Sequence, residues 1–100
     1  MKPKLKRYHS IDDFGRSLGL SAVEIELIRQ KKKLIEKLRK ARIKKGLSQA
    51  RLAAKVGSKQ PAIARMESGQ ISEVSMDFLL KIAFVLNVSV AIRSSLHDAA

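Results

Sequence analysis

Apolar residues recur at helical spacing in two short stretches that lie close together between Leu47 and Gly69. In the first stretch, Ser48 is a suitable N-cap residue and the apolar positions share one face, which predicts a helix over 49–56. The positions on that face are Leu52, Ala53 and Val56. Gly57 follows the last of them, and because a left-handed backbone costs glycine little, we expect the helix to end there.

A second helix is predicted to begin almost at once and to end before the next glycine. Ser58 could cap this helix, and Pro61 is tolerated only in a first helical turn. Ile63 and Met66 would then point inward. Two helices joined so closely must cross steeply, and the small Ala53 lies where they would meet, so a larger side chain there should push them apart.

A longer apolar pattern precedes this helix pair. Residues 22–45 contain neither glycine nor proline, which predicts one helix of about 36 Å, although a break near 30–33 is possible. Its apolar stripe comprises Val23, Leu27, Leu34, Leu38 and Ala41. The residues that follow the pair predict a further helix over 76–86, with Ser75 as N-cap and Asn87 as the stop. That helix would close a core, and its stripe comprises Phe78, Leu79, Ile82, Ala83 and Leu86, widened by Phe84 and Val85.

Apolar and polar residues alternate over 88–93, which predicts a short C-terminal β-strand with Val88, Val90 and Ile92 on one side. The sequence offers no obvious second strand, and an unpaired strand is unstable in isolation. The same strand of a second subunit, or a strand of another protein, would be the simplest partner. The alternative is an extended coil packed on the core. Residues 94–100 are expected to be frayed.

The N-terminal third is predicted to lie outside this helical core. Residues 1–9 are expected to form a basic mobile arm, which is either a solvated tail or an arm that contacts phosphates or a minor groove. Residues 10–32 are expected to form a helical extension. Its apolar side chains would either pack on one another or provide a partner surface. These side chains are Phe14, Leu18, Ile25, Leu27 and Ile28.

Charge narrows the choice of partners. The 100 residues suffice for a single small domain, and 21 Lys and Arg against 9 Asp and Glu give a net charge of +12, as expected of a polyanion binder. Lys81 and Asn87 interrupt the apolar runs near the C-terminus, and no apolar segment follows the basic N-terminus, so we expect a cytoplasmic protein without a membrane segment.

The sequence offers little for catalysis or cofactors. The chain has no cysteine, and His9 and His97 lie at opposite ends without partner ligands, so we expect no metal site and no cofactor. No histidine lies where it could activate a serine nucleophile, and no glycine-rich phosphate loop is present, so no enzymatic activity is expected.

The two-helix motif resembles the helix-turn-helix repressors of lambdoid phages and their relatives, the Xre or Cro type. The resemblance is carried by Gln49, Ala53, Gly57, Gln60, Ile63, Met66 and Glu67. It implies an all-α, lambda-repressor-like bundle over 33–87. Because the family pairs an arginine at the Arg42 position with the glutamate at the Glu67 position, it also implies a structural ion pair between these residues.

In this motif the second helix enters the major groove with its N-terminal residues toward the base edges. Gln60 is the best candidate base reader, since one amide can donate to and accept from adenine. The other expected base contacts are Lys59, Pro61, Ala62 and Arg65. Phosphate contacts are expected at the helix starts, where free N–H groups attract anions, and in the basic run over 29–45. These phosphate contacts are Ser48, Gln49, Ser58, Arg39 and Lys40, although Gln49 could instead be a plain solvent-exposed neighbour of the cap.

Two functions follow from these expectations. In one, a homodimer binds two operator half-sites in double-stranded DNA about 34 Å apart and represses transcription, as a stand-alone regulator. In the other, the repressor is also an antitoxin. The chain resembles HigA-like antitoxins, which neutralise a RelE/HigB-like RNase toxin and repress their own operon. That resemblance is carried by the GLSQ to ARMESG motif, the added segment DDFGRSLGLSAVEIELI and the terminal VSVAIR. A module that binds only protein is a more distant alternative, which a gel shift would test.

Overall fold

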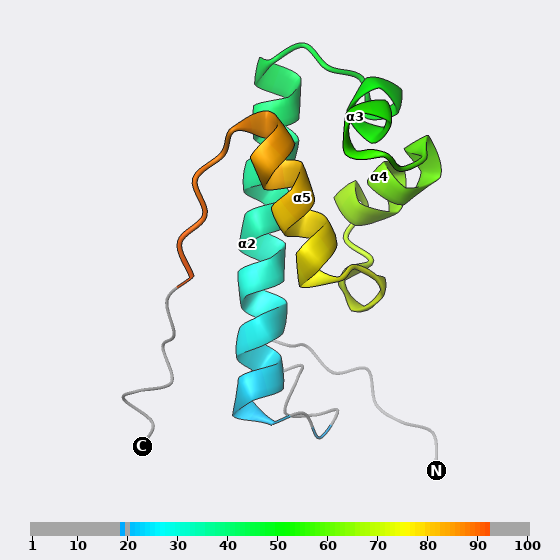
Figure 1. The fold of residues 1–100 in the computed structure, drawn as a ribbon. Helices are drawn as coiled ribbons and strands as arrows, with labels where there is room; N and C mark the ends of the chain where they lie inside the picture. Colours follow the sequence, from blue (N-terminus) through cyan, green and yellow to red (C-terminus); the bar gives the residue numbers. More distant parts are fainter. Residues whose placement is uncertain (1–18, 20, 93–100) are drawn as a thin grey trace.

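The long helix α2 is the axis of the molecule, and three shorter helices are stacked beside its C-terminal half (Figure 1). A computed structural model of the chain describes residue 19 and residues 21–92. The described elements are α2 (Ala22–Lys44), α3 (Gln49–Val56), α4 (Gln60–Glu67), the short 3-10 helix η1 (Ile71–Glu73) and α5 (Met76–Leu86). The predicted arm over 1–9, the side chains of Phe14 and Leu18, and the tail over 94–100 lie outside the described residues.

Helix α2 begins with a complete capping box. The hydroxyl of Ser21 accepts a hydrogen bond from the backbone N–H of Glu24, and the Glu24 carboxylate accepts one from the N–H of Ser21, each at 3.1 Å. The helix then continues through 30–33 without the break considered possible above. Its 23 residues correspond to about 35 Å. Consequently, α2 extends well beyond the helices that pack against its C-terminal half.

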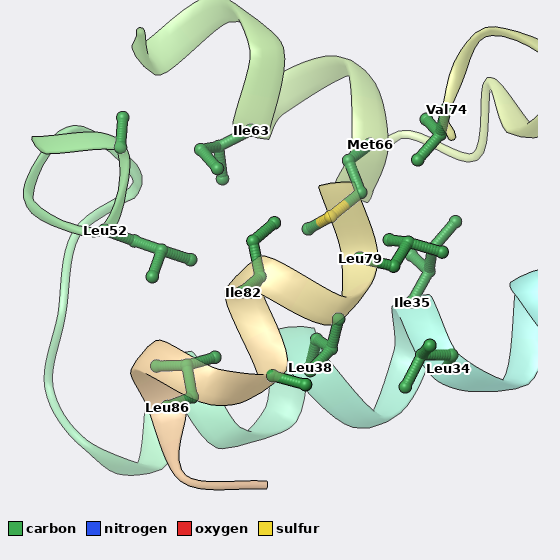
Figure 2. Packing of buried hydrophobic residues seen from close by; sticks show 12 residues of the cluster. Leu34, Ile35, Leu38, Leu52, Ile63, Met66, Val74, Leu79, Ile82 and Leu86 are labelled. Atoms are coloured by element: carbon green, nitrogen blue, oxygen red, sulfur yellow. The ribbon is translucent and has the colours of Figure 1, made fainter. Parts of the chain in front are cut away.

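The core lies where the four helices meet. Leu38 of α2 and Leu52 of α3 are fully buried, and Figure 2 shows Ile63 and Met66 of α4 directed toward α5. The side chains of α5 that complete the core are Leu79, Ile82, Ala83 and Leu86. This confirms the prediction that the 76–86 helix closes the core. Phe84 and Val85 were expected to widen the same stripe, but they are 78% and 39% exposed.

Two helices end as the sequence predicted, through a residue with a left-handed backbone. Gly57 has φ of +72°, and the N–H of the next residue, Ser58, donates to the carbonyl of Ala53 at 2.8 Å. Asn87 has φ of +56°, and the N–H of Val88 donates to Ala83 at 2.9 Å. Both ends therefore satisfy the last helical carbonyls through a Schellman motif.

The start of α4 differs from the prediction. The N-cap residue is Lys59, not Ser58, and no side chain bonds to the first turn of this helix. Ser58 belongs to the end of α3, because its N–H completes that helix's Schellman motif. The next helix therefore begins one residue later than a serine cap would place it.

The predicted C-terminal strand is wrong for the residues that the structure describes. Residues 88–92 have no strand pairing and follow α2 as an extended coil (Figure 1). Val88 and Val90 pack against the core, and the ammonium of Lys37 donates to the carbonyl of Ser89 at 2.6 Å. The alternation of the sequence thus places Val88 and Val90 on the protein's own core, as the coil alternative predicted. None of the described helices is long and apolar enough to cross a membrane.

Candidate nucleic-acid interface

An ion pair joins the end of α2 to the end of α4. The guanidinium of Arg42 donates through Nε to Oε2 of Glu67 at 2.6 Å and through a terminal nitrogen to Oε1 at 2.8 Å. The remaining terminal nitrogen donates to the carbonyl of Leu47 at 2.7 Å. The two side chains are only 12% and 5% exposed. The pair implied by the family resemblance therefore holds α4 and the α2–α3 loop in one orientation.

The surroundings of this pair keep both partners charged. Burial raises the pKa of the Glu67 carboxyl, but hydrogen bonds from Arg42 and Gln49 and the nearby charges of Arg42 and Arg39 outweigh it, so the pKa lies below its ordinary value. The hydrogen bond to Glu67 raises the pKa of Arg42, although burial opposes that shift. Glu67 is therefore a carboxylate at neutral pH and acts only as an acceptor.

A chain of hydrogen bonds leads from this carboxylate to the start of α4. Oε1 of Glu67 accepts from the amide nitrogen of Gln49 at 3.0 Å. The amide oxygen of Gln49 accepts in turn from the amide nitrogen of Gln60 at 2.8 Å. Because a carboxylate cannot donate, Gln49 must direct its NH₂ group toward Glu67 and its oxygen toward Gln60. The charge of Glu67 therefore fixes which way both amides face.

Gln60 is the first residue of α4 and its side chain is exposed. After the bond to Gln49, its amide retains one N–H donor and the oxygen acceptor. A donor beside an acceptor matches the N6 and N7 edge of adenine in the major groove. The arrangement can thus present an oriented amide to one base pair.

The other predicted base contacts surround Gln60. Lys59, Pro61 and Arg65 are exposed, and Ala62 is half-buried on the same helix. No side chain makes a cap hydrogen bond at the start of α4, so the N–H groups of its first turn have no side-chain acceptor. Arg65 lines a shallow hollow together with Glu73 and Phe78, beside the loop that follows α4.

The predicted phosphate contacts are divided between two places. Ser48 and Gln49 lie at the start of α3, where Ser48 caps the helix by accepting from the N–H of Arg51 at 3.0 Å. Arg39 and Lys40 lie exposed on α2. Arg39 is 3.8 Å from Glu36 in a solvent-exposed pair, which leaves its guanidinium available to other anions. Ser58, the remaining candidate, is half-buried between α3 and α4.

Sequence reasoning did not find the connection between Gln49 and Gln60. It assigned the two amides separate roles, one toward phosphate and one toward bases, whereas the structure joins them in one network with Arg42 and Glu67. The available signal was that a glutamine is the first residue of each of the two helices. The short connection was expected to make these helices cross steeply, which can bring their starts together.

The described residues that were predicted to contact a protein partner differ in exposure. In the extension, Ile25 is buried, Ile28 is half-buried and Leu27 is 45% exposed. In the C-terminal segment, Val88 and Val90 are half-buried and Ile92 is exposed. Within the described part of the chain, no group of three histidine or acidic side chains could hold a metal ion.

The arrangement of α3, Gly57 and α4 defines a helix-turn-helix DNA-binding domain. A family model described as "Helix-turn-helix" matches residues 38–92, which are 55 of the 100 residues. The chain therefore belongs to the helix-turn-helix family of the Xre/Cro type and is a DNA-binding transcription regulator. Comparison with curated proteins finds no match, and comparison with solved structures finds none either.

Proposed function

We propose that this protein is a sequence-specific repressor in which Gln60 reads an adenine. The observation that carries the proposal is the hydrogen-bond chain from Arg42 through Glu67 and Gln49, because it orients the Gln60 amide before any DNA is bound. An amide that is already oriented loses less conformational freedom on binding, so its pairing with the correct base contributes more to affinity.

In the proposed complex, α4 lies in the major groove. Lys59 and Arg65 reach a guanine edge or a phosphate, and Pro61 and Ala62 contact a thymine methyl group. Ser48, Gln49 and Ser58 hold the phosphates beside the helix starts, and Arg39 and Lys40 hold those that face α2. A homodimer would place two such domains on half-sites about 34 Å apart.

The proposal is tested by selecting binding sites from random DNA. Gln60→Ala should relax the preference at one position of each half-site, where a good bidentate contact discriminates by about 1–3 kcal/mol. Gln70→Ala is the matched control, since Gln70 is also exposed but lies outside the network. If the Gln60 variant selects the same sites with the same stringency as the wild type, Gln60 is not the base reader.

We further propose that the regulator is the antitoxin of a HigA-like pair and neutralises a RelE/HigB-like RNase toxin. The support is that α2 begins sixteen residues before the matched family region and exposes Val23 and Leu27, at 65% and 45%, on that additional part. Exposed apolar side chains on a part of the helix that has no proposed DNA contact suit a protein partner.

Copurification from the native operon should recover a toxin that arrests growth when expressed alone. Leu27→Asp should abolish this copurification and the rescue of growth while leaving operator binding unchanged. Absence of any partner and of growth arrest would favour the stand-alone regulator.

A further inference from the structure

A second hollow lies between α2, the start of α5 and the C-terminal coil; Figure 1 shows the coil running beside α2. Its volume is about 220 Å³. Its apolar lining comes from Leu34 of α2, Met76 at the start of α5, and Val90 and Ile92 of the coil. This volume is below the roughly 300–1,000 Å³ of sites that enclose whole small molecules, so it suits individual side chains of a docked segment.

The coil beside this hollow is fixed but unpaired. Its start is held by the bond from Val88 to Ala83 and by the bond from Lys37 to the Ser89 carbonyl. No hydrogen bond within the described residues involves the backbone of Val90 or Ala91. Extended backbone with unpaired N–H and C=O groups is the template to which a partner strand adds.

The charge around the hollow selects the kind of segment that fits. Lys33 and Lys37 line it, and Lys32 and Lys40 lie next to them on α2. The only acid among these neighbours is Glu36, which is paired with Arg39. A second copy of this chain would bring another molecule of net charge +12 and an uncharged 88–92 segment, so it would not complement this rim.

We infer that this groove binds an extended segment of another protein in which acidic and apolar residues alternate. The segment pairs with the backbone of the coil at Val90 and Ala91, places an apolar side chain over Leu34 and Met76, and directs its carboxylates toward Lys33 and Lys37. Because the groove is lined by α2, the start of α5 and the coil, whereas the base-reading residues lie on α4, the regulator can hold this partner and DNA together.

The test titrates the full-length protein, labelled with ¹⁵N, with a short acetylated peptide in which glutamate alternates with leucine. We expect shifts of the backbone amides at 33–37, 76 and 90–92, and the same affinity when operator DNA is present. Two control peptides separate the contributions: one alternates glutamate with serine, and the other alternates lysine with leucine. Both should bind much more weakly, because each lacks either the apolar side chains or the carboxylates.

Substitutions in the groove should weaken binding of the glutamate–leucine peptide, whether they remove rim charge or apolar surface. Lys33→Glu should weaken binding by about fivefold, as expected for reversal of one rim charge. Ile92→Ser should weaken it by about tenfold through lost apolar burial. Their matched controls, Lys44→Glu and Ile43→Ser, alter exposed α2 residues outside the groove and should have little effect.

Three results would overturn the inference. One is binding of the glutamate–serine peptide as tightly as the glutamate–leucine peptide, which would mean attraction by net charge alone. Another is a set of shifts confined to α3 and α4, which would place the peptide on the DNA face. The third is a concentration-dependent shift of 90–92 without any peptide, which would make a second copy the occupant.

Discussion

Glu67 determines the geometry of the reading face although it contacts no base in the proposed complex. Its carboxylate accepts from both Arg42 and Gln49, and the amide of Gln60 is oriented only through Gln49. A neutral amide at position 67 could rotate and present an N–H to Gln49. The orientations of the Gln49 and Gln60 amides would then no longer be fixed. The charge of Glu67 therefore determines how Gln60 presents its hydrogen-bond donor and acceptor.

Glu67 should also make the stability of the protein depend on pH. Because its pKa in the folded state lies below the ordinary 4.5, its contribution to stability is complete above about pH 4.5 and is lost as the pH falls through the lower folded value. Glu67→Gln should lower the free energy of unfolding by about 1–3 kcal/mol at pH 7, and the difference from wild type should shrink in acid. Urea denaturation at pH 7 and pH 3 measures this. The control is Glu36→Gln, whose exposed pair should contribute little; equal losses in the two variants would contradict the prediction.

Gly57 gives a prediction that depends on the backbone alone. An added Cβ would meet no atom within 4 Å, so any cost of Gly57→Ala arises from φ of +72° and not from a clash. We expect a loss of about 1–2 kcal/mol, the penalty of a left-handed backbone for an ordinary residue. Gly57→Asn should lose less, since Asn87 already adopts this conformation in the same protein. Thermal or urea denaturation would count against this account if alanine were tolerated as well as asparagine.

At the scale of the helices, the sequence predicted what local signals determine. The bounds of 49–56 and 76–86 are those of α3 and α5, because a serine cap and a left-handed stop act within a few residues of the chain. The start of α4 was misplaced because Ser58 could serve either helix, and only the fold assigns it to the first.

Features that depend on residues far apart in the sequence were harder to predict from the sequence. The 88–93 alternation could not distinguish a strand from a coil on the core, since both bury alternate residues. The Gln49–Gln60 bond required the crossing of two helices, and the Arg42–Glu67 pair was expected only from the family.

Ala53 tests how closely α3 and α4 must pack. Ala53 is buried in the core, whereas its neighbour Ala54 is exposed on the same helix. Ala53→Leu should cost about 1–3 kcal/mol through overpacking and should weaken DNA binding as well, because the relation between Gln49 and Gln60 would change. Ala54→Leu is the matched control for helix propensity and hydrophobicity. If both variants retain wild-type stability and operator affinity, the close approach of these helices is not required.

At the scale of the molecule, the helix-turn-helix and the groove are two surfaces with different chemistry. The helix-turn-helix presents oriented amides and helix N-termini, which suit a duplex. The groove joins apolar side chains to lysines and unpaired backbone, which suits a protein segment. The +12 charge favours both an acidic segment and DNA. Only DNA is a polyanion that releases condensed counterions on binding, so the affinity for DNA should depend more strongly on salt.

The salt dependence of DNA binding should therefore identify which cations meet phosphates. Each phosphate contact contributes about 0.9 to the slope of log affinity against log salt, so Arg39→Ala or Lys40→Ala should reduce the slope by about that amount and weaken all DNA sequences alike. Gln60→Ala should do the opposite, changing sequence preference while leaving the slope intact. Lys81→Ala provides the control, since Lys81 is exposed on α5 and is not among the predicted contacts. The measurement is a series of fluorescence titrations from low to high salt on operator and on random DNA. An unchanged slope for both α2 variants would show that the phosphates run elsewhere, and the proposed orientation of α2 beside the duplex would have to be abandoned.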